Sequence, residues 1–265
     1  MLGKGHGETP FTKGVSPHKK ITMKITFLGT SHGVPSEIRY CQSIMLEVGE
    51  AVYLIDGGAP VGDLLTRRGV AFERTKAVFF THMHSDHCAG IHEFLALASW
   101  YYKTCSYDVY MPDEYYVNAF HALHVEMDRE RVRLHAFPGE GEVYRDENIT
   151  VTAVPTRHME HSCAYVIDTA DGKRLIVTGD LHGGDAADFP QIAKDEPSDA
   201  IICEQAHFPM ETIFGHLRVC PTKQVWMTHV AYNYDVSIAK LREAEANHTL
   251  PMPMHAVDDG DVYEI

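Results

Sequence analysis

The stretch Thr81–Gly90 reads THMHSDHCAG and gathers three histidines and one aspartate within six positions. Directly before it, KAVFF (Lys76–Phe80) is a short apolar run that is typical of a buried strand. His82 and His84 are two positions apart, so on an extended segment their side chains point the same way. We expect Asp86 and His87 to fall on the following turn and at the start of the next helix. Imidazole nitrogens and carboxylate oxygens are good ligands for zinc, and also for manganese or iron. The alternative is a loop of solvent-exposed histidines, but H-x-H-x-D-H after an apolar strand favours a metal site.

Three more apolar strands are expected to end in a metal-binding side chain. TAVPTRH ends at His158, RLIVTGD ends at Asp180, and VWMTH ends at His229. Taken singly, His158 or His229 could be a buried, hydrogen-bonded histidine. Taken with the cluster, they predict one site built where several strands end. Seven candidate ligands are too many for one tetrahedral ion but suit two ions that share a carboxylate: His82, His84, Asp86, His87, His158, Asp180 and His229.

Composition restricts the class of protein. The 265 residues are 45% hydrophobic and 23% charged, which is ordinary for a globular chain. The formal net charge of −14 argues against broad nucleic-acid binding through a basic face. No apolar run approaches the roughly 18 residues of a membrane-spanning helix. The six cysteines form no C-x-x-C pair, so we expect reduced thiols and a cytoplasmic location.

Strand-like and helix-like stretches alternate along most of the chain. We expect residues 1–20, rich in Gly, Lys and Pro, to be a flexible leader. Residues 21–265 contain no repeat, no low-complexity block and no long linker. They therefore predict a single α/β domain in which helices pack on sheets.

The combined motifs resemble the metallo-β-lactamase superfamily. The resemblance rests on THMHSDH, the later His158, TGD with Asp180 and MTH with His229, and runs from about Ile21 to the C-terminus. It implies a four-layer αββα sandwich with a dinuclear site at one edge of the two sheets. It further implies that His82, His84 and His158 hold one metal, that Asp86, His87 and His229 hold the other, and that Asp180 bridges them.

Three features resemble the phosphodiesterase branch of that superfamily, which includes the tRNA 3′-processing endonuclease RNase Z and the cyclic phosphodiesterase PhnP. They are the opening FLGTSHGVPS, a tyrosine (Tyr165) seven residues after His158, and IICEQAHF, which places Glu204 and His207 at a strand end. In that branch a histidine of this region protonates the leaving oxygen, which makes His207 the candidate. Glu204 is predicted to orient a ligand histidine as a hydrogen-bond acceptor.

The spacing argues against tRNA as the substrate. RNase Z enzymes usually carry a tRNA-gripping arm between the ligands that match His158 and Asp180, whereas here 21 residues intervene, with a DGK turn at Asp171–Lys173. The short interval is closer to the cyclic phosphodiesterase, although the Cys-rich insert of that enzyme is absent and only Cys41 lies nearby. The resemblance therefore favours hydrolysis of a small or cyclic phosphodiester.

The expected mechanism uses two divalent ions, zinc or manganese with iron as a further option, and a hydroxide that bridges them. Asp86 is both a ligand and the acceptor of the nucleophile's proton, and His207 gives a proton to the departing alkoxide. Arg157 could hold a phosphate oxygen, although a surface arginine is the preferred interpretation. Weaker candidates for the rim of the site are His161, His182, Ser31 and His32.

Two rival functions remain open at this point. One is hydrolysis of a lactone, an ester or a thioester at the same metal site, which needs no leaving-group acid. The other is a non-catalytic domain that uses metal for structure or sensing, which the full ligand set argues against. The aromatic runs SWYYKT (Ser99–Thr104) and DEYYVNAF (Asp113–Phe120) could line a wall for a base or sugar. We expect them instead in the core or at the surface of a homodimer.

Overall fold

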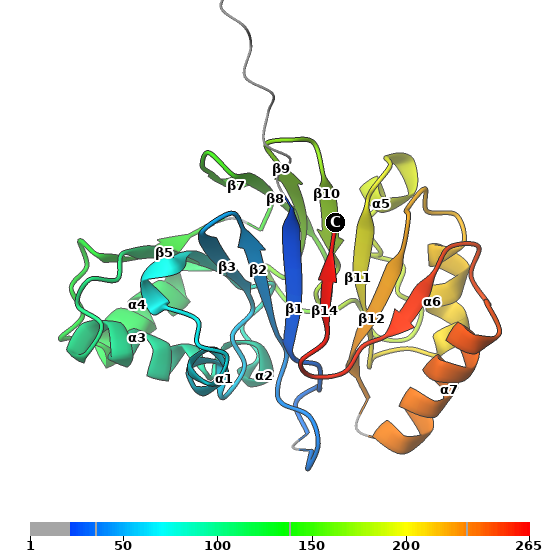
Figure 1. The fold of residues 1–265 in the computed structure, drawn as a ribbon, viewed down its shortest axis with the longest axis horizontal. Coiled ribbons are helices and arrows are strands. Elements are labelled where there is room, and N and C mark those ends of the chain that lie inside the picture. The colour runs from blue at the N-terminus through cyan, green and yellow to red at the C-terminus, as the bar shows by residue number, and fades with distance from the viewer. Residues whose placement is uncertain (1–21, 35, 138, 232) are drawn as a thin grey trace, which may run out of the picture.

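Two seven-stranded β-sheets face each other, and helices cover the outer face of each (Figure 1). The protein is described from a computed structural model, which describes residues 22–34, 36–137, 139–231 and 233–265. The predicted leader, residues 1–20, lies outside the described residues. This arrangement confirms the expected αββα sandwich. A single domain over residues 21–265 remains our proposal, supported by the core that the two sheets share.

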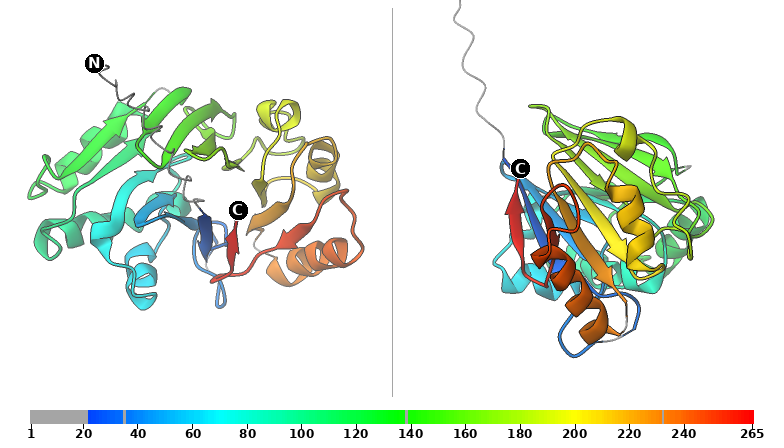
Figure 2. Two further views of the ribbon diagram at one scale, coloured as in Figure 1. Left: turned by 45° about the horizontal axis from the view of Figure 1, so that its top comes forward. Right: turned by 90° about the vertical axis from the view of Figure 1, so that its right-hand side faces the viewer.

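The first sheet has the strand order β14-β1-β2-β3-β4-β5-β6 and the second the order β13-β12-β11-β10-β9-β8-β7. The first and last strands of the chain lie side by side, because β14 pairs antiparallel with β1 (Figure 2). The strands of the first sheet are β1 (Met23–Gly29), β2 (Ser43–Val48), β3 (Ala51–Ile55), β4 (Thr75–Phe79), β5 (Tyr107–Met111), β6 (Val132–Ala136) and β14 (Val262–Glu264). Those of the second are β7 (Gly141–Arg145), β8 (Ile149–Pro155), β9 (Cys163–Thr169), β10 (Arg174–Val177), β11 (Ala200–Gln205), β12 (Val225–Val230) and β13 (Met254–Ala256).

The helices flank the sheets in two groups. The chain forms α1 (Val61–Arg67), the 3₁₀ turn η1 (Phe72–Arg74), α2 (Ser85–Cys88), α3 (Ile91–Trp100) and α4 (Glu114–Leu123), followed by α5 (Ile192–Asp195), α6 (Met210–Leu217) and α7 (Tyr234–Ala246). Helices α1 to α4 lie on the outer side of the first sheet, and α6 and α7 lie on the outer side of the second (Figure 1). No helix in the described part of the chain is long and apolar enough to span a bilayer.

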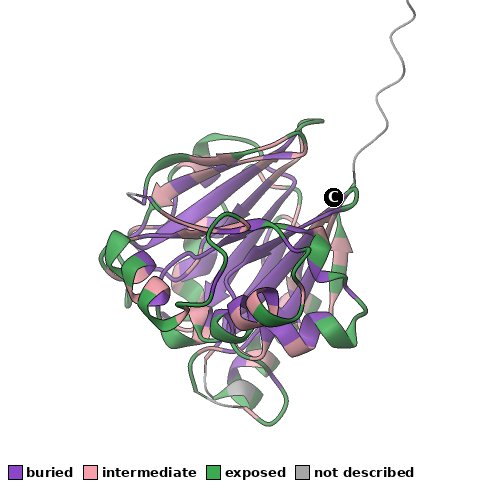
Figure 3. Ribbon diagram, turned by 90° about the vertical axis from the view of Figure 1, so that its left-hand side faces the viewer, coloured by how far each residue is buried: buried purple, intermediate pink, exposed green. Residues whose placement is uncertain are grey.

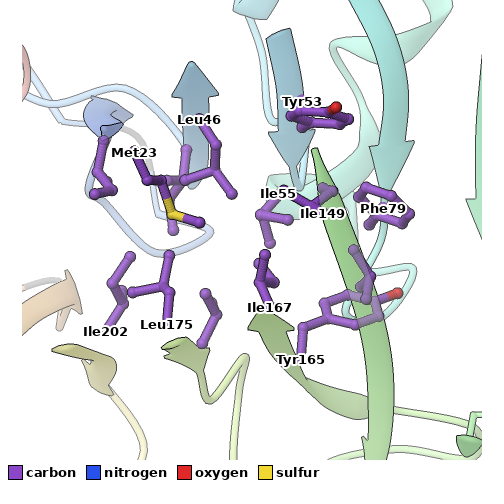
Figure 4. Packing of buried hydrophobic residues seen from close by; sticks show 14 of the residues in the cluster. Met23, Leu46, Tyr53, Ile55, Phe79, Ile149, Tyr165, Ile167, Leu175 and Ile202 are labelled. Atoms are coloured by element: carbon purple, nitrogen blue, oxygen red, sulfur yellow. The ribbon is translucent and has the colours of Figure 1, made fainter. Parts of the chain in front are cut away.

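The period of two along the strands divides their side chains between separate cores. In β3, Tyr53 and Ile55 point into the core between the sheets, while Val52 and Leu54 pack under the helices. The core between the sheets contains Met23, Leu46, Phe79, Tyr165 and Ile202 (Figure 4). Buried strands therefore fill the middle of the molecule, and exposed residues gather on the helices and loops (Figure 3). Since both faces of these strands are covered, their sequences are nearly continuous apolar runs.

The predicted aromatic runs divide between core and surface. Phe120 is buried among the helices, and Tyr102 and Tyr116 pack against the same core. Trp100 and Tyr101, in contrast, are 57% and 77% exposed, so of the two expected positions, core or homodimer surface, the core is excluded for them. The homodimer remains a prediction. All six cysteines are free thiols, as expected.

Candidate metal centre

The loop after β4 is held in shape by a buried carboxylate. Asp56 follows β3 and is 1% exposed. Its Oδ1 accepts a hydrogen bond from the backbone N–H of Thr81 at 2.8 Å, and its carboxylate also accepts from the Thr81 hydroxyl. The ring Nδ1 of His87, on α2, lies 2.8 Å from Asp56 Oδ2. One carboxylate therefore fixes both the start of the loop and the ring of His87.

Close backbone contacts leave no room for side chains where this loop crosses the Asp-Gly-Gly turn. A Cβ on Gly58 would lie 2.2 Å from the carbonyl oxygen of Asp86, and a Cβ on Gly90 would lie 2.6 Å from the carbonyl oxygen of Gly58. Gly33, in the loop after β1, lies flat against the Asp86 carboxylate, which a Cβ there would approach to 3.3 Å. Gly58 and Gly90 must therefore be glycine for this close approach, whereas at Gly33 a Cβ would only make a tight contact.

The first group of candidate ligands consists of three imidazoles and a carboxylate. His84 Nδ1 lies 3.0 Å from His82 Nε2 and 3.1 Å from His158 Nε2. Asp180 Oδ2 lies 3.6 Å from Nε2 of both His82 and His158. His82 is fully buried and His84 is exposed, so His82 lies on the interior side of this group and His84 on its solvent side.

The second group lies beside the first and uses the same aspartate. His87 Nε2 lies 3.1 Å from His229 Nε2 and 3.4 Å from Asp180 Oδ2. Asp86 Oδ2 lies 3.3 Å from His229 Nε2 and 3.6 Å from His87 Nε2. A single oxygen atom, Asp180 Oδ2, therefore faces both groups.

These distances fit metal ions. Ligand atoms about 2.0–2.1 Å from a tetrahedral ion are about 3.3 Å from one another, and the candidate ligand atoms are separated by 3.0–3.6 Å. Asp180 Oδ1 and His229 Nδ1 are buried without a hydrogen bond among the described residues. Converging nitrogens and an unsatisfied buried carboxylate oxygen are what a site for positive ions requires. The His and Asp groups thus suit divalent metal.

The backbone of β12 bends to bring His229 into this centre. The register with β11 shifts between Glu204 and Gln205, which leaves His229 as the extra residue of a β-bulge. Its φ of 49° lies in the left-handed region, which is unusual for a residue other than glycine. Backbone strain of this kind clusters at functional sites.

The pKa values of several side chains in the centre are shifted far from their usual ranges. Burial lowers the pKa of His82 well below the usual range of histidine, and the charge of His87 lowers it further. Burial also lowers the pKa of His87, but Asp180 and Asp56 outweigh it and hold that pKa well above the usual range. Burial raises the pKa of Asp180, yet the facing histidines, His229 first, hold it well below its usual range. Asp180 is therefore ionised, as a metal ligand must be.

His207 lies at the edge of the centre with one nitrogen turned toward it. Its Nε2 is 3.8 Å from Asp180 Oδ2, and its Nδ1 is 2.8 Å from Glu204 Oε2. Burial lowers the pKa of His207, but the hydrogen bond to Glu204 and the charges of Glu204 and Asp180 together outweigh it, so the pKa is raised above its usual value. Asp180, Glu204, His207 and His229 could also be grouped around an ion. Both oxygens of Glu204 are already engaged, however, since Oε1 accepts from the N–H of Leu181 at 2.6 Å.

The position of Glu204 corrects one expectation. It was predicted to orient a ligand histidine, but its hydrogen bond is to His207, and His229 Nδ1 is 3.9 Å away. The ligand His87 is oriented by Asp56 instead. Asp56 is not among the predicted site residues, although its place at a strand end before Gly57-Gly58 is the same signal that marked Asp180.

The remaining candidates lie around the rim. The Arg157 side chain is exposed, and its backbone N–H donates to Asp188 Oδ2 at 2.6 Å. Asp188 also accepts from the N–H of His182 at 3.0 Å, so it joins the loops that carry His158 and Asp180. The ring of His32 is tilted relative to that of His229, with the ring centroids 6.1 Å apart, and the hydroxyl of Ser31 donates to the carbonyl of His32. His161 Nε2 lies 3.3 Å from Asp113 Oδ2.

A family model and curated relatives match this chain. The family model of the anti-Pycsar protein Apyc1 matches residues 23–245. Ribonuclease Z of Acaryochloris marina is 31% identical over 153 residues, which are 56% of this chain and 48% of that protein. The chain spans about half the length of the curated relatives it matches.

Solved structures share the fold at low identity. The metallo-β-lactamase fold protein YhfI from Bacillus subtilis superposes with a TM-score of 0.75 at 19% identity, covering 92% of this chain and 100% of that one. A diphosphatase of the PhnP family superposes with a TM-score of 0.68 at 16% identity, covering 92% and 98%. The predicted superfamily, its RNase Z and PhnP branch, and the αββα fold are therefore confirmed.

Proposed function

Because this chain belongs to the anti-Pycsar protein Apyc1 family and is similar to the RNase Z and PhnP branch of the metallo-β-lactamase superfamily, we propose that it is a metal-dependent hydrolase of small or cyclic phosphodiesters. The observation that carries the proposal is His207. This histidine is bonded to Glu204 on one side and presents its other nitrogen to a centre with two groups of candidate ligands.

Two divalent ions would be held by the residues whose nitrogens and oxygens converge. His82, His84 and His158 would hold one ion, Asp86, His87 and His229 would hold the other, and Asp180 would be shared, since its Oδ2 faces both groups. When bound, zinc or manganese, or iron, supplies Lewis acidity and lowers the pKa of water toward neutrality.

The chain's own residues move the protons. Burial raises the pKa of Asp86, but the hydrogen bond from His229 and the charges of His87 and His229 together outweigh it and hold the pKa well below its usual range, so the carboxylate is ionised. Asp86 therefore accepts the proton of the attacking water. His207, held by Glu204 with its Nε2 toward the centre, gives a proton to the departing alkoxide. Asp56 and Glu204 hold His87 and His207 in the tautomers that these roles need.

The net charge of the chain and the short segment between His158 and Asp180 both favour a small substrate. Between these residues the chain forms only β9, the turn at Asp171–Lys173 and β10, so no projecting arm interrupts the sheet. With a net charge of −14, the chain has no surplus of Lys and Arg to neutralise the phosphates of a tRNA.

The leaving group tests the role of His207. An alkoxide needs a proton to depart, whereas p-nitrophenolate does not, and general acid catalysis typically contributes about 10²–10⁴-fold. His207→Ala should therefore lose about that factor in kcat/KM with a cyclic nucleotide, and far less with bis(p-nitrophenyl) phosphate. A matched control is His216→Ala, on α6, whose ring stacks on Phe189.

Three results would count against the proposal. Equal losses on both substrates with the metal content intact would assign His207 to phosphate binding. Loss of metal from His207→Ala would make it a ligand. Turnover of a lactone or a thioester orders of magnitude faster than any phosphodiester would favour the ester hydrolase instead.

A further inference from the structure

A pair of histidines lies outside the candidate metal centre, where helix α3 begins and helix α4 ends. His92 is the second residue of α3, and His124 follows the last residue of α4. The two helices lie next to each other on the outer side of the first sheet (Figure 1). His92 Nδ1 faces His124 Nε2 across 3.1 Å. Two imidazole nitrogens from separate helices therefore meet near the surface of the molecule.

The separation of these two nitrogens matches that of the histidine pairs in the candidate metal centre. There, His84 Nδ1 lies 3.0 Å from His82 Nε2, and His87 Nε2 lies 3.1 Å from His229 Nε2. Ligand atoms about 2.0–2.1 Å from a tetrahedral ion are about 3.3 Å from one another. A single ion can therefore contact both nitrogens of the pair after a small movement of the rings.

Packing holds both rings in place. The ring of His92 stacks on that of Phe120, with centroids 4.6 Å apart and planes 15° from parallel, and Phe120 is 5% exposed. The ring of His124 lies 27° from parallel to that of His92. The backbone of His124 is also fixed, because its N–H donates to the carbonyl of Phe120 at 2.9 Å and its carbonyl accepts from the N–H of the buried Met127 at 3.0 Å. Ligands that are already ordered lose little entropy when they bind an ion.

The two rings also have the protonation state that a metal ligand needs. Burial lowers the pKa of His92, and burial together with the charge of His92 lowers the pKa of His124. Both rings are therefore neutral at pH 7. A neutral imidazole carries one hydrogen, so it offers one nitrogen as a ligand when the hydrogen is on the other. In the hydrogen-bonded pair one ring donates to the other, and on metal binding the donated hydrogen moves to the far nitrogen of its own ring, so no net proton is released.

We propose that His92 and His124 form a further metal site, separate from the candidate centre, that binds a divalent transition-metal ion. Imidazole is a good ligand for copper, nickel and zinc, and copper binds most tightly in their usual order of affinity. Water fills the remaining coordination positions, because the pair supplies two ligands. The ion links α3 to α4 and lies at the C-terminal end of α4, where the partial negative charge of the helix favours a cation. The site goes beyond the proposed hydrolysis and does not depend on it.

Fewer protein ligands make this site weaker than the candidate centre. Each ion of the centre would have three ligands and a share in Asp180, whereas the pair offers two nitrogens. The pair should therefore fill after the centre and lose its ion when free ions are removed. The metal that stays bound after that removal belongs to the centre alone.

Equilibrium dialysis against zinc counts the ions that bind at each free concentration. It uses the full-length protein without an added histidine tag. The variants are His92→Ala and His124→Ala, each of which removes one ligand. The matched control is His216→Ala, because the ring of His216 also stacks on a phenylalanine at 15°, that of Phe189, but its Nε2 faces the carbonyl oxygen of Asp185.

Copper added to the zinc-loaded wild type gives a second measurement that needs no variant. The hyperfine splitting in its electron paramagnetic resonance spectrum counts the nitrogens bound to the copper ion. Elemental analysis of the same sample shows that the centre keeps its zinc. The spectrum should show two nitrogen ligands in the wild type and fewer in either variant.

At high free zinc, the wild type and His216→Ala should bind one equivalent more than His92→Ala or His124→Ala, while all four proteins keep the same tightly bound zinc. An extra equivalent that persists in both variants, or that is absent from the wild type, would overturn the proposal. Its loss from His216→Ala as well, or a wild-type copper spectrum with fewer than two nitrogens, would also overturn it. Loss of the tightly bound zinc from the variants would tie the pair to the centre and exclude a separate site.

Discussion

Replacing Asp56 by asparagine should weaken one metal position and spare the other. Asn has the shape of Asp and tolerates the left-handed backbone that residue 56 adopts, with a φ of 59°. Its amide, however, has one acceptor and one donor end. If Oδ1 keeps the hydrogen bond from the Thr81 N–H, then Nδ2–H faces His87 Nδ1. The ring of His87 must then carry its proton on Nε2, the atom that faces His229 and Asp180.

The size of the effect follows from the bond that is lost. Removal of a partner that orients a metal-binding histidine typically costs about 10–100-fold in metal affinity, which corresponds to about 1.4–2.7 kcal/mol. The opposite orientation of the amide is also unfavourable, because it places one donor, Nδ2–H, against another donor, the N–H of Thr81. We therefore expect one of two equivalents of zinc to bind about 10–100-fold more weakly in Asp56→Asn.

Competition with a chromophoric chelator measures the two affinities separately. The equivalent held by His82, His84 and His158 should keep its affinity, since none of these three rings is hydrogen-bonded to Asp56 itself and His82 is joined to it through Thr81. Asp146→Asn is the matched control, because Asp146 likewise accepts from backbone N–H groups, those of Asn148 and Ile149, but lies beside Tyr53. Wild-type affinity at both positions of Asp56→Asn would refute the reasoning.

Two further substitutions test the fold. Gly58→Ala should lower the free energy of unfolding in urea by about 1–3 kcal/mol, because its Cβ would lie 2.2 Å from the Asp86 carbonyl oxygen; wild-type stability would contradict the contact. Burial raises the pKa of Glu47, but Lys24 and Arg74 outweigh it and lower the pKa below its usual value. The stability that Glu47 contributes is therefore present at a pH above the usual pKa, and it is lost as the pH falls through the pKa of the folded state. Glu47→Gln should therefore destabilise the protein at pH 7 and converge with wild type in acid; a loss independent of pH would exclude these ion pairs as its cause.

Much of the centre is predictable from sequence because its ligands are local or end apolar strands. One loop and one helical turn set the spacing of His82, His84, Asp86 and His87. This pattern can therefore be recognised in the sequence without knowledge of the fold. Strand ends gather at one edge of a sandwich, and backbone bonds join the sheets there, from the N–H of Val230 to Thr30 and from the N–H of Cys163 to Thr81.

The supporting carboxylates are not predictable in the same way. Asp56 meets His87 across 31 positions of sequence, and Asp188 meets Arg157 across another 31. A single aspartate beside a glycine is a common turn signal, so the sequence does not reveal which histidine it orients. The sequence also does not predict β7 or β14, since these edge strands are short and partly exposed and lack the apolar runs of the central strands.

The central claim is that Asp180 joins two metal positions in one site. The most direct measurement is the metal content per chain by elemental analysis, after reconstitution with zinc or manganese and removal of free ions, for wild type and Asp180→Ala. The wild type should approach two equivalents, and Asp180→Ala should retain less, because one carboxylate oxygen faces both ligand groups. A firm plateau at one equivalent that Asp180→Ala leaves unchanged would contradict the account.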